Sequence, residues 1–432
     1  MSTLSPAPGS TTGPKSSGGA VEPAATLGLL RQPKTVLFGP GQRHQLPFLV
    51  AGIARHLLVT TDARMAQSSD FLEIIEGIRA KGTEVSIYAE AEPDLPRENI
   101  VDVAMQFRGS EVDAILGIGG GSCMDLAKVV AVVLANEGDV RDYYGEFLVP
   151  GPGLPVITVP TTGGTGAEVT CVSVVFDREK GMKVGVASPF LEPFAAVIDP
   201  ELTLSCPPGL TAATGADALS HLIETFTGRV KRPTPEDIDT KLYVGKNRLA
   251  DMFARNGLHL LNTSLEAVAA DPSNLEARSD TMLAAYNAGM AINTAGTAGA
   301  HAIQGAIGNL THTPHGFGIS ALLPYVMRFN LPERVPEFAE IGRIFGVADP
   351  ADAELDQART GIVRVEELLA ALGAPLDLKT LGLDPGDFDF VADQAMLATR
   401  LTANNPRELT RERIVAILER AYADDRSWWV VG

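Results

Sequence analysis

The sequence has little of what several classes of protein require. Its three cysteines, Cys123, Cys171 and Cys206, are odd in number and widely separated, which excludes a disulfide framework or a cysteine-rich metal site. No apolar run approaches the ~20 residues that a membrane-spanning helix needs. Acidic residues outnumber basic ones by 53 to 35, and the net charge of −18 argues against a nucleic-acid surface. We therefore expect a reduced, cytoplasmic protein that binds neither membrane nor nucleic acid.

The chain of 432 residues is long enough for two or three domains. Residues 1–25 are rich in Ser, Gly, Pro, Thr and Ala without an apolar segment, so we expect a disordered tail there and no signal peptide. Between residues 26 and 205, short apolar strands alternate with helical segments, which predicts a mostly parallel sheet covered on both faces. From 206 to 432 the periodicity is almost entirely helical. The predicted fold class is an N-terminal α/β nucleotide-binding domain followed by an all-α domain for metal and substrate, with a cleft between them.

The pattern also places individual elements. Strands are expected at 35–39, 56–62, 84–88, 112–118, 155–160 and 195–199. In the second half, helices are expected at 212–227, 248–270, 275–298, 335–345, 361–372, 388–398 and 411–423.

Successive glycines follow one of the predicted strands. The segment 119–122, Gly-Gly-Gly-Ser, joins the strand at 112–118 to a long helical segment. Backbone N–H groups in such a loop, together with the dipole of the following helix, favour a bound phosphate. The strict Gly-x-Gly-x-x-Gly fingerprint of dinucleotide-binding folds is absent. Ser122 and Asp125 also have the spacing of a helix capping box, which would explain Asp125 without a ligand.

A second polar loop, residues 160–168 with the sequence Pro-Thr-Thr-Gly-Gly-Thr-Gly-Ala-Glu, follows another predicted strand. Small hydroxyl residues and glycines at the end of a buried strand suit ribose and phosphate contacts, with a plain turn as the alternative. Asp62 ends a further strand. A carboxylate there would accept hydrogen bonds from the adenosine ribose and repel a 2′-phosphate, favouring NAD over NADP, whereas capping at the surface is the alternative.

Four side chains in the second half have the chemistry of a metal site. Asp217 and His221 lie four residues apart in a segment that reads as helix, so both point from one face. His301 and His315 lie further along, and the whole chain has only seven histidines. One carboxylate and three imidazoles suit a first-row metal such as Fe or Zn better than Mg or Ca. The alternative is a capped helix with buried histidines bonded to the backbone.

Four motifs together resemble the iron-containing (group III) alcohol dehydrogenase family. They are the segments 119–128 (GGGSCMDLAK), 160–170 (PTTGGTGAEVT), 215–221 (GADALSH) and 313–316 (TPHG), in that family's order and spacing. The resemblance implies a dehydroquinate synthase-like fold and a homodimer or larger homo-oligomer. The metal ligands that it implies are Asp217, His221, His301 and His315. The NAD contacts that it implies are Asp62, Gly120, Gly121, Ser122, Asp125, Thr161, Thr162, Thr165 and Lys183.

The sequence departs from the family's pattern in two places. Many members carry a histidine four residues after the third ligand, where this sequence has Gly305, so no proton-relay role can be carried over to that position. His312 is the candidate substitute, with packing of the metal segment as the alternative. Residues 229–247 form a polar, proline-containing insertion, expected near the mouth of the cleft. It resembles the longer connection of hydroxyacid–oxoacid transhydrogenases in the same superfamily.

The predicted activity is NAD-dependent oxidation of an alcohol or reduction of an aldehyde. Fe²⁺, or Zn²⁺ as the alternative, would polarise the substrate oxygen while hydride is exchanged with nicotinamide C4. A hydroxyacid–oxoacid transhydrogenase is one alternative, and a metal lyase of the dehydroquinate synthase type is a second. Because the segment 290–308 is rich in small residues, we expect a small-molecule alcohol or aldehyde larger than ethanol.

Overall fold

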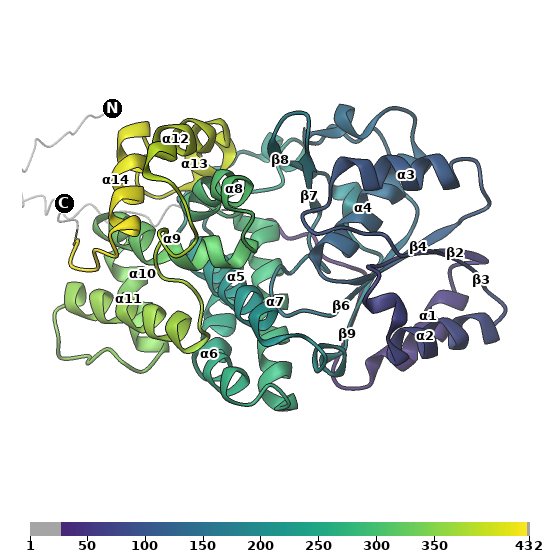
Figure 1. The fold of residues 1–432 in the computed structure, drawn as a ribbon, viewed down its shortest axis with the longest axis horizontal. Helices are drawn as coiled ribbons and strands as arrows, with labels where there is room; N and C mark the ends of the chain where they lie inside the picture. Colours follow the sequence, from purple (N-terminus) through teal and green to yellow (C-terminus); the bar gives the residue numbers. More distant parts are fainter. Residues whose placement is uncertain (1–26, 430–432) are drawn as a thin grey trace, which may run out of the picture.

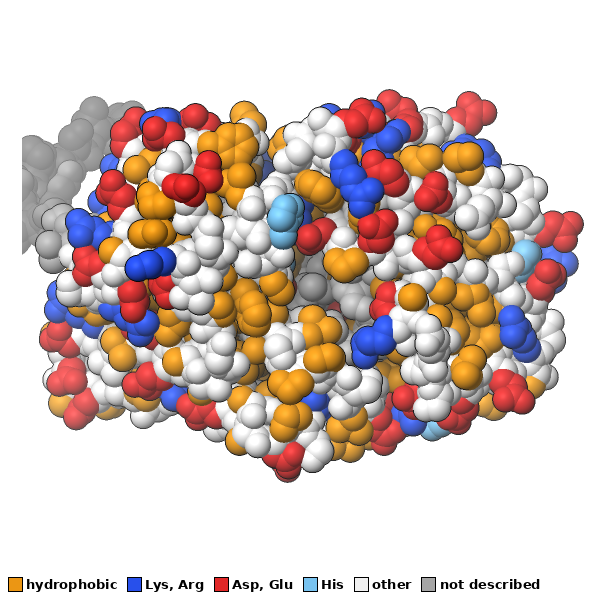
Figure 2. All heavy atoms as spheres, viewed as in Figure 1, with side chains coloured by type: hydrophobic (Ala, Val, Ile, Leu, Met, Phe, Trp, Pro, Cys, Tyr) orange, Lys and Arg blue, Asp and Glu red, His pale blue; other side chains and the backbone are white. Residues whose placement is uncertain are grey.

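A computed structural model describes residues 27–429, so the tail expected at residues 1–25 lies outside the described residues. Figure 1 shows an α/β half, which carries the N-terminal part of the chain, beside a larger helical half. The surface is hollowed between the two halves (Figure 2). Within residues 27–429, every helix is too short or too polar to traverse a lipid bilayer.

The α/β half is built on a six-stranded sheet in the order β1-β9-β6-β4-β2-β3. Each neighbouring pair is parallel. All six strands that the sequence predicts are present: β1 (Thr35–Phe38), β2 (His56–Thr60), β3 (Glu84–Tyr88), β4 (Ala114–Gly119), β6 (Val156–Pro160) and β9 (Ala195–Ile198). The central strands β4 and β6 are buried along their whole length, as a parallel sheet covered on both faces requires.

Helices cover both faces of this sheet. Alternate residues point to opposite sides, so that Leu58 and Ile115 pack under α3 (Arg97–Phe107) and α4 (Gly121–Ala135). Leu57 and Leu116 pack on the other side, under α1 (Leu46–Ala51) and α2 (Ser69–Ala80). The doubly covered sheet predicted from the alternating sequence pattern is therefore confirmed.

A second, three-stranded sheet stands beside the main one. It has the order β5-β8-β7, made of β5 (Gly145–Glu146), β7 (Val172–Asp177) and β8 (Met182–Ala187). Strands β7 and β8 form an antiparallel pair, which the sequence pattern does not predict.

The helical half is arranged around α5 (Pro208–Thr227), in which every residue from Gly215 to Thr227 is buried. A helix that is buried on all sides belongs in the interior of a domain. The helices packed against it are α6 (Arg248–Ala270), α7 (Leu275–Ala295), α8 (Gly299–Thr311), α9 (His315–Asn330) and α10 (Val335–Ile344). An outer layer follows, made of α11 (Glu354–Ala371), α12 (Phe388–Leu397), α13 (Thr399–Asn404) and α14 (Arg411–Tyr422).

Helices α8 and α9 lie where the sequence pattern predicts none. Both begin with glycine-rich segments, and α9 contains Pro324, all of which weaken intrinsic helix propensity. Burial of their apolar faces overrides that weakness. The boundary expected between the two domains at residue 205 stays a prediction. The first long helix of the second half, α5, begins three residues later, at Pro208.

The two halves meet where the loop after β6 lies against the helical half. A Cβ atom added to Gly164 would lie 2.6 Å from the Cβ of Thr214 on α5. Gly166 has a left-handed φ of 65°, and a Cβ atom added to Gly289 on α7 would lie 2.5 Å from the Gly166 carbonyl oxygen. Only glycines permit these close approaches, so they set the position of the loop relative to α5 and α7.

We expect Gly289→Ala to lower the free energy of unfolding by about 2 kcal/mol. Alanine gains about 1 kcal/mol in helix propensity, but the added methyl group collides with the Gly166 backbone, which costs about 3 kcal/mol. Denaturant unfolding measures the difference. Gly305→Ala is the matched control, because that helical glycine has no atom within 4 Å of an added Cβ and the change should stabilise the protein. Equal stability changes in the two variants would contradict the close packing.

Candidate metal and nucleotide sites

Three helices of the second half bring four side chains to one point. Asp217 and His221 are one turn apart on α5, His301 lies in the first turn of α8, and His315 begins α9. Asp217 Oδ1 lies 3.6 Å from His221 Nε2, 3.6 Å from His301 Nε2 and 3.5 Å from His315 Nε2. The ligand atoms of Asp217, His301 and His315 all lie within 4.8 Å of one another. The structure thus brings together all four residues of the predicted metal site.

The distances from Asp217 Oδ1 to the three histidines fit a shared cation, although His221 lies outside the mutual 4.8 Å group formed by Asp217, His301 and His315. Separations of 3.5–3.6 Å are too long for hydrogen bonds. Four ligands placed tetrahedrally at ~2.1 Å from a metal would be ~3.4 Å apart. Asp217 Oδ1 and His301 Nε2 are buried, and neither has a hydrogen-bond partner among residues 27–429. Because buried polar atoms rarely lack partners, these two atoms and the donor set fit a first-row divalent metal.

Glu224 is a functional residue of this site that the sequence reasoning missed. Its Oε2 lies 2.6 Å from His301 Nδ1, and its two carboxylate oxygens also accept hydrogen bonds from Ala298 N (2.9 Å) and Ala300 N (2.6 Å). A carboxylate in this position holds the proton on Nδ1 and leaves the Nε2 lone pair free for a metal. The sequence does contain a signal for Glu224: it follows Asp217 by seven residues, which is two turns of α5, so both carboxylates lie on the same face of the helix.

Burial and mutual charge set the protonation of the four residues. Burial lowers the pKa of His221 to about 4 and that of His315 to about 3, so both imidazoles are neutral at pH 7. Burial raises the pKa of Asp217, but the neighbouring imidazoles outweigh it and hold that pKa well below its usual range.

The pKa of His301 moves the other way. Burial lowers it, but Glu224 and Asp217 outweigh burial and raise it to about 9. His301 is therefore the imidazole of the cluster that Glu224 and Asp217 favour in its protonated form, and a metal on Nε2 would compete with that proton.

On the nucleotide side, the structure brings the glycine loop and the threonine loop together. Strands β4 and β6 are neighbours, with Gly119 paired to Pro160, and Thr161 N donates to Gly119 O at 2.9 Å. A Cβ atom added to Gly121 would lie 2.9 Å from Thr165 Cγ2, and one added to Gly120 would lie 4.0 Å from Thr162 Oγ1. The predicted contacts Gly120, Gly121, Ser122, Thr161, Thr162 and Thr165 thus border one end of the sheet.

The start of α4 has free donors for a phosphate. Gly120 is its N-cap and supplies no side-chain cap, so the first N–H groups of the helix have no side-chain partner there. The capping box expected from Ser122 and Asp125 is therefore wrong. Asp125 instead accepts a hydrogen bond from Val174 N (2.9 Å) and pairs with Lys128 at 2.8 Å, so its carboxylate braces α4 against β7.

Asp62 lies at the same end of the sheet as the glycine loop. Its Oδ1 accepts hydrogen bonds from Arg64 N and Met65 N, each at 2.9 Å, so the expected capping contact is present. Its Oδ2 lies 3.8 Å from Cys123 Sγ at the start of α4. The carboxylate therefore retains an oxygen that faces the nucleotide loops.

Three further candidates from the sequence are Lys183, His312 and Gly305. Lys183, on β8, pairs with Asp94 at 2.6 Å, and its charge is one of those that act on His315. His312 is exposed and occupies the C-cap of α8 with a left-handed φ of 51°. Gly305, one turn beyond His301 on α8, is partly exposed and has no atom within 4 Å of an added Cβ, so there is open space beside it.

The insertion 229–247 connects the two halves instead of hanging free. Its residues Leu242, Tyr243 and Val244 are buried. Leu242 N donates to Glu146 Oε2 of β5 at 3.1 Å, and Arg31 Nη2 donates to Ile238 O at 2.7 Å.

Known proteins resemble this chain over most of its length. A family model described as iron-containing alcohol dehydrogenase matches residues 33–200, and one for the C-terminal part of the same family matches residues 211–422. The NAD-dependent methanol dehydrogenase of Bacillus methanolicus is 32% identical over 368 residues, which cover 85% of this chain and 92% of that protein. The 1,3-propanediol dehydrogenase of Klebsiella pneumoniae is 32% identical over 397 residues, which cover 90% of this chain and 97% of that protein.

Solved structures have the same fold. An alcohol dehydrogenase from Oenococcus oeni superposes with a TM-score of 0.85 at 30% identity, covering 92% of this chain and 100% of that one. These matches confirm the family resemblance, the dehydroquinate synthase-like fold class and the predicted NAD- and metal-dependent alcohol dehydrogenase activity. The chain belongs to the iron-containing alcohol dehydrogenase family.

Proposed function

We propose that this protein interconverts an alcohol and its aldehyde or ketone at a divalent metal held by Asp217, His221, His301 and His315. One observation carries the assignment: three imidazole Nε2 atoms lie 3.5–3.6 Å from a buried carboxylate oxygen that has no hydrogen-bond partner. When bound, the metal polarises the substrate oxygen, and the nicotinamide accepts or returns the hydride.

The ligand residues control the charge of the site. Asp217 supplies one negative charge, whereas His221 and His315 are neutral. A divalent cation and Asp217 alone would leave one net positive charge facing the substrate oxygen, which favours the negative charge that develops there, while Glu224, whose pKa is also lowered, places its own negative charge behind His301. Glu224 holds His301 in the required tautomer through Nδ1.

The glycine and threonine loops are proposed to hold NAD. Free N–H groups at the start of α4 suit the pyrophosphate, and the Asp62 carboxylate suits the adenosine ribose. Thr214, which the threonine loop touches at Gly164, is three residues before Asp217 on the same helix. This direct packing supports a constant separation between nicotinamide and metal, which hydride transfer requires.

The two alternative activities receive less support. The relatives named above are dehydrogenases, which favours free exchange of NAD over transhydrogenation. A lyase of the dehydroquinate synthase type needs cations around the metal for an anionic substrate, yet Lys183, the lysine whose charge reaches His315, is paired with Asp94. Homo-oligomerisation and a cytoplasmic location remain part of the proposal.

We expect His221→Ala to weaken metal binding by more than roughly a hundredfold, because it removes a direct ligand. NAD-linked turnover of alcohols should be lost with the metal. Metal analysis of the purified protein measures the metal content, and bulk NADH formation by the same preparation measures turnover. His312→Ala is the control, since that exposed histidine should leave the metal content unchanged. Full turnover in His221→Ala would contradict the ligand assignment, and alcohol–oxoacid exchange by the wild type without bulk NADH would contradict the dehydrogenase assignment.

We expect Glu224→Gln to weaken metal affinity by roughly 10–100-fold, because glutamine is a poorer acceptor for His301 Nδ1–H. Competition with a chelator measures the metal Kd directly. The affinity for NAD, measured by fluorescence titration, serves as the internal control and should not change. An unchanged metal Kd would show that Glu224 acts only by holding the start of α8.

The space beside Gly305 is proposed to receive the chain of a substrate larger than ethanol. We expect Gly305→Leu to lower kcat/KM for long primary alcohols by roughly tenfold and to leave short ones nearly unchanged, because its side chain would fill the open space next to His301. Steady-state kinetics along a series of alcohols of increasing length test this. Gly305→Ala is the matched control and should alter the profile little. A uniform loss across the series would contradict the proposed role.

A further inference from the structure

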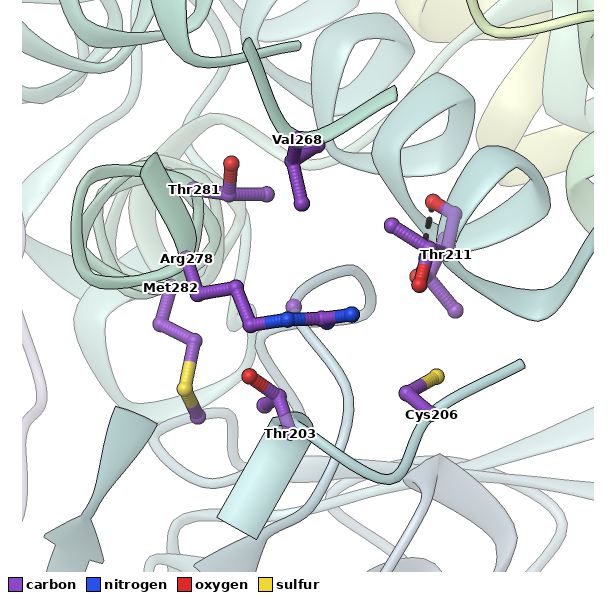
Figure 3. Close-up of a pocket in the computed structure, with 9 residues that line it drawn as sticks. Thr203, Cys206, Thr211, Val268, Arg278, Thr281 and Met282 are labelled. Atoms are coloured by element: carbon purple, nitrogen blue, oxygen red, sulfur yellow. Dashed lines mark hydrogen bonds between the residues drawn. The ribbon is translucent and has the colours of Figure 1, made fainter. Parts of the chain in front are cut away.

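Arg278 is a buried cation outside the metal and nucleotide sites described above. It lies in the first turn of α7, and its side chain is 3% exposed. Its Nε donates to Pro272 O at 2.5 Å, whereas Nη2 is buried and has no hydrogen-bond partner in the part of the chain that the structure describes. Figure 3 shows the guanidinium extending into a pocket between Thr203 and Cys206 on one side and Thr211 on the other.

The charge of Arg278 is not compensated by the surrounding protein. No carboxylate among residues 27–429 forms an ion pair with it, whereas the equally buried Arg328 is paired with Glu366. Burial lowers the pKa of Arg278, and the neighbouring group that opposes this is the Cys206 thiol. Burial raises the pKa of that thiol, so it stays neutral at pH 7 and supplies no negative charge. A buried, unpaired guanidinium is strongly unfavourable unless an anion accompanies it.

The pocket is lined by hydrogen-bond donors, some of which lack an acceptor. Within residues 27–429, Thr211 Oγ1 is buried and, like Arg278 Nη2, has no nitrogen or oxygen partner, and its hydroxyl faces the neutral Cys206 thiol. The other threonine hydroxyl groups that line the pocket are engaged: Thr203 donates to Pro200 O at 2.8 Å, Thr214 to Leu210 O at 2.9 Å and Thr281 to Ala277 O at 2.8 Å. The pocket therefore holds a charged donor without a partner and a hydroxyl group whose neighbour is only a weak acceptor, which suits an anionic ligand.

The small volume of the pocket limits which anions can fit in it. Its cavity volume is about 10 Å³, roughly the space of one water-sized sphere. Sulfate and phosphate carry four oxygens and would require the lining side chains to move. A chloride ion is only slightly larger than water, and unlike water it neutralises the guanidinium.

We propose that the pocket formed by Arg278 and Thr211 is a halide site that binds one chloride ion. The site joins both halves of the protein, because Gly163 of the threonine loop and Thr203 line it together with residues of α5 and α7. Bound chloride should therefore stabilise the junction between the halves, independently of the metal.

Chloride dependence of unfolding tests the proposal. The full chain is titrated with sodium chloride against sodium gluconate at constant ionic strength, and Tm is measured. The wild type should show a saturable rise in Tm with chloride and with bromide. Thr211→Val should weaken the apparent halide Kd by roughly tenfold, because it removes one donor to the anion. Thr214→Val is the matched control, since its hydroxyl already donates within α5, and it should keep the wild-type Kd.

A crystal grown in sodium bromide locates the ion. An anomalous peak within hydrogen-bonding distance of Arg278 Nη2 and Thr211 Oγ1 is expected, and Arg278→Gln should lose both the peak and the halide dependence. If Arg278→Gln fails to fold, the halide Kd values of Thr211→Val and Thr214→Val still test whether chloride binds in this pocket. A water molecule or a nucleotide atom in place of bromide, or equal Tm values in chloride and gluconate, would overturn the proposal.

Discussion

The burial of one carboxylate, Asp217, is the constraint around which the helical half is organised. Its side chain lies within a helix whose central residues are inaccessible to water, yet its pKa is held well below the usual range, so it remains charged. Such a charge is tolerated only with compensating partners. Imidazoles from α5, α8 and α9 surround it, and their Nε2 atoms stop short of hydrogen-bonding distance. The packing of these helices thus gathers the four residues that we propose as ligands of a cation.

The glycines at the junction between the halves matter for chemistry as much as for packing. Gly164 and Gly166 let the threonine loop approach the backbone of α5 and α7, as Gly289 does from the other side. Because α5 carries two of the four proposed ligands, the loop proposed to bind NAD and the metal cluster share one rigid support. Two reacting groups on such a support keep their distance without the need for a separate positioning element.

Some of the buried polar atoms without a partner in residues 27–429 lie where ligands are expected, and others lie elsewhere. The unpartnered atoms of Asp217 and His301 lie at the metal cluster, and those of Arg278 and Thr211 face a small pocket. Gly305 weakens a helix interior without any close contact that requires a glycine. Sites at which local stability is given up are often those that bind something else.

The strands are predictable from residue order alone, because alternation between short apolar runs and helical segments is a local property with a physical period. All six strands of the main sheet follow from it, as does the Asp217–His221 pair, whose four-residue spacing places both side chains on one helix face. The glycine run after β4 is local in the same sense, since a tight turn into a helix needs residues without a Cβ atom.

Features that depend on contacts between residues far apart in the chain are set by long-range packing. Helices α8 and α9 have weak local propensity and form because the interior accepts their apolar faces. Asp125 braces β7, 49 residues away, and Glu224 orients His301, 77 residues away. The free donors around Arg278 likewise come from separate segments. Sequence periodicity reports which face of an element is buried, whereas the identity of the atom opposite a given side chain is set by long-range packing.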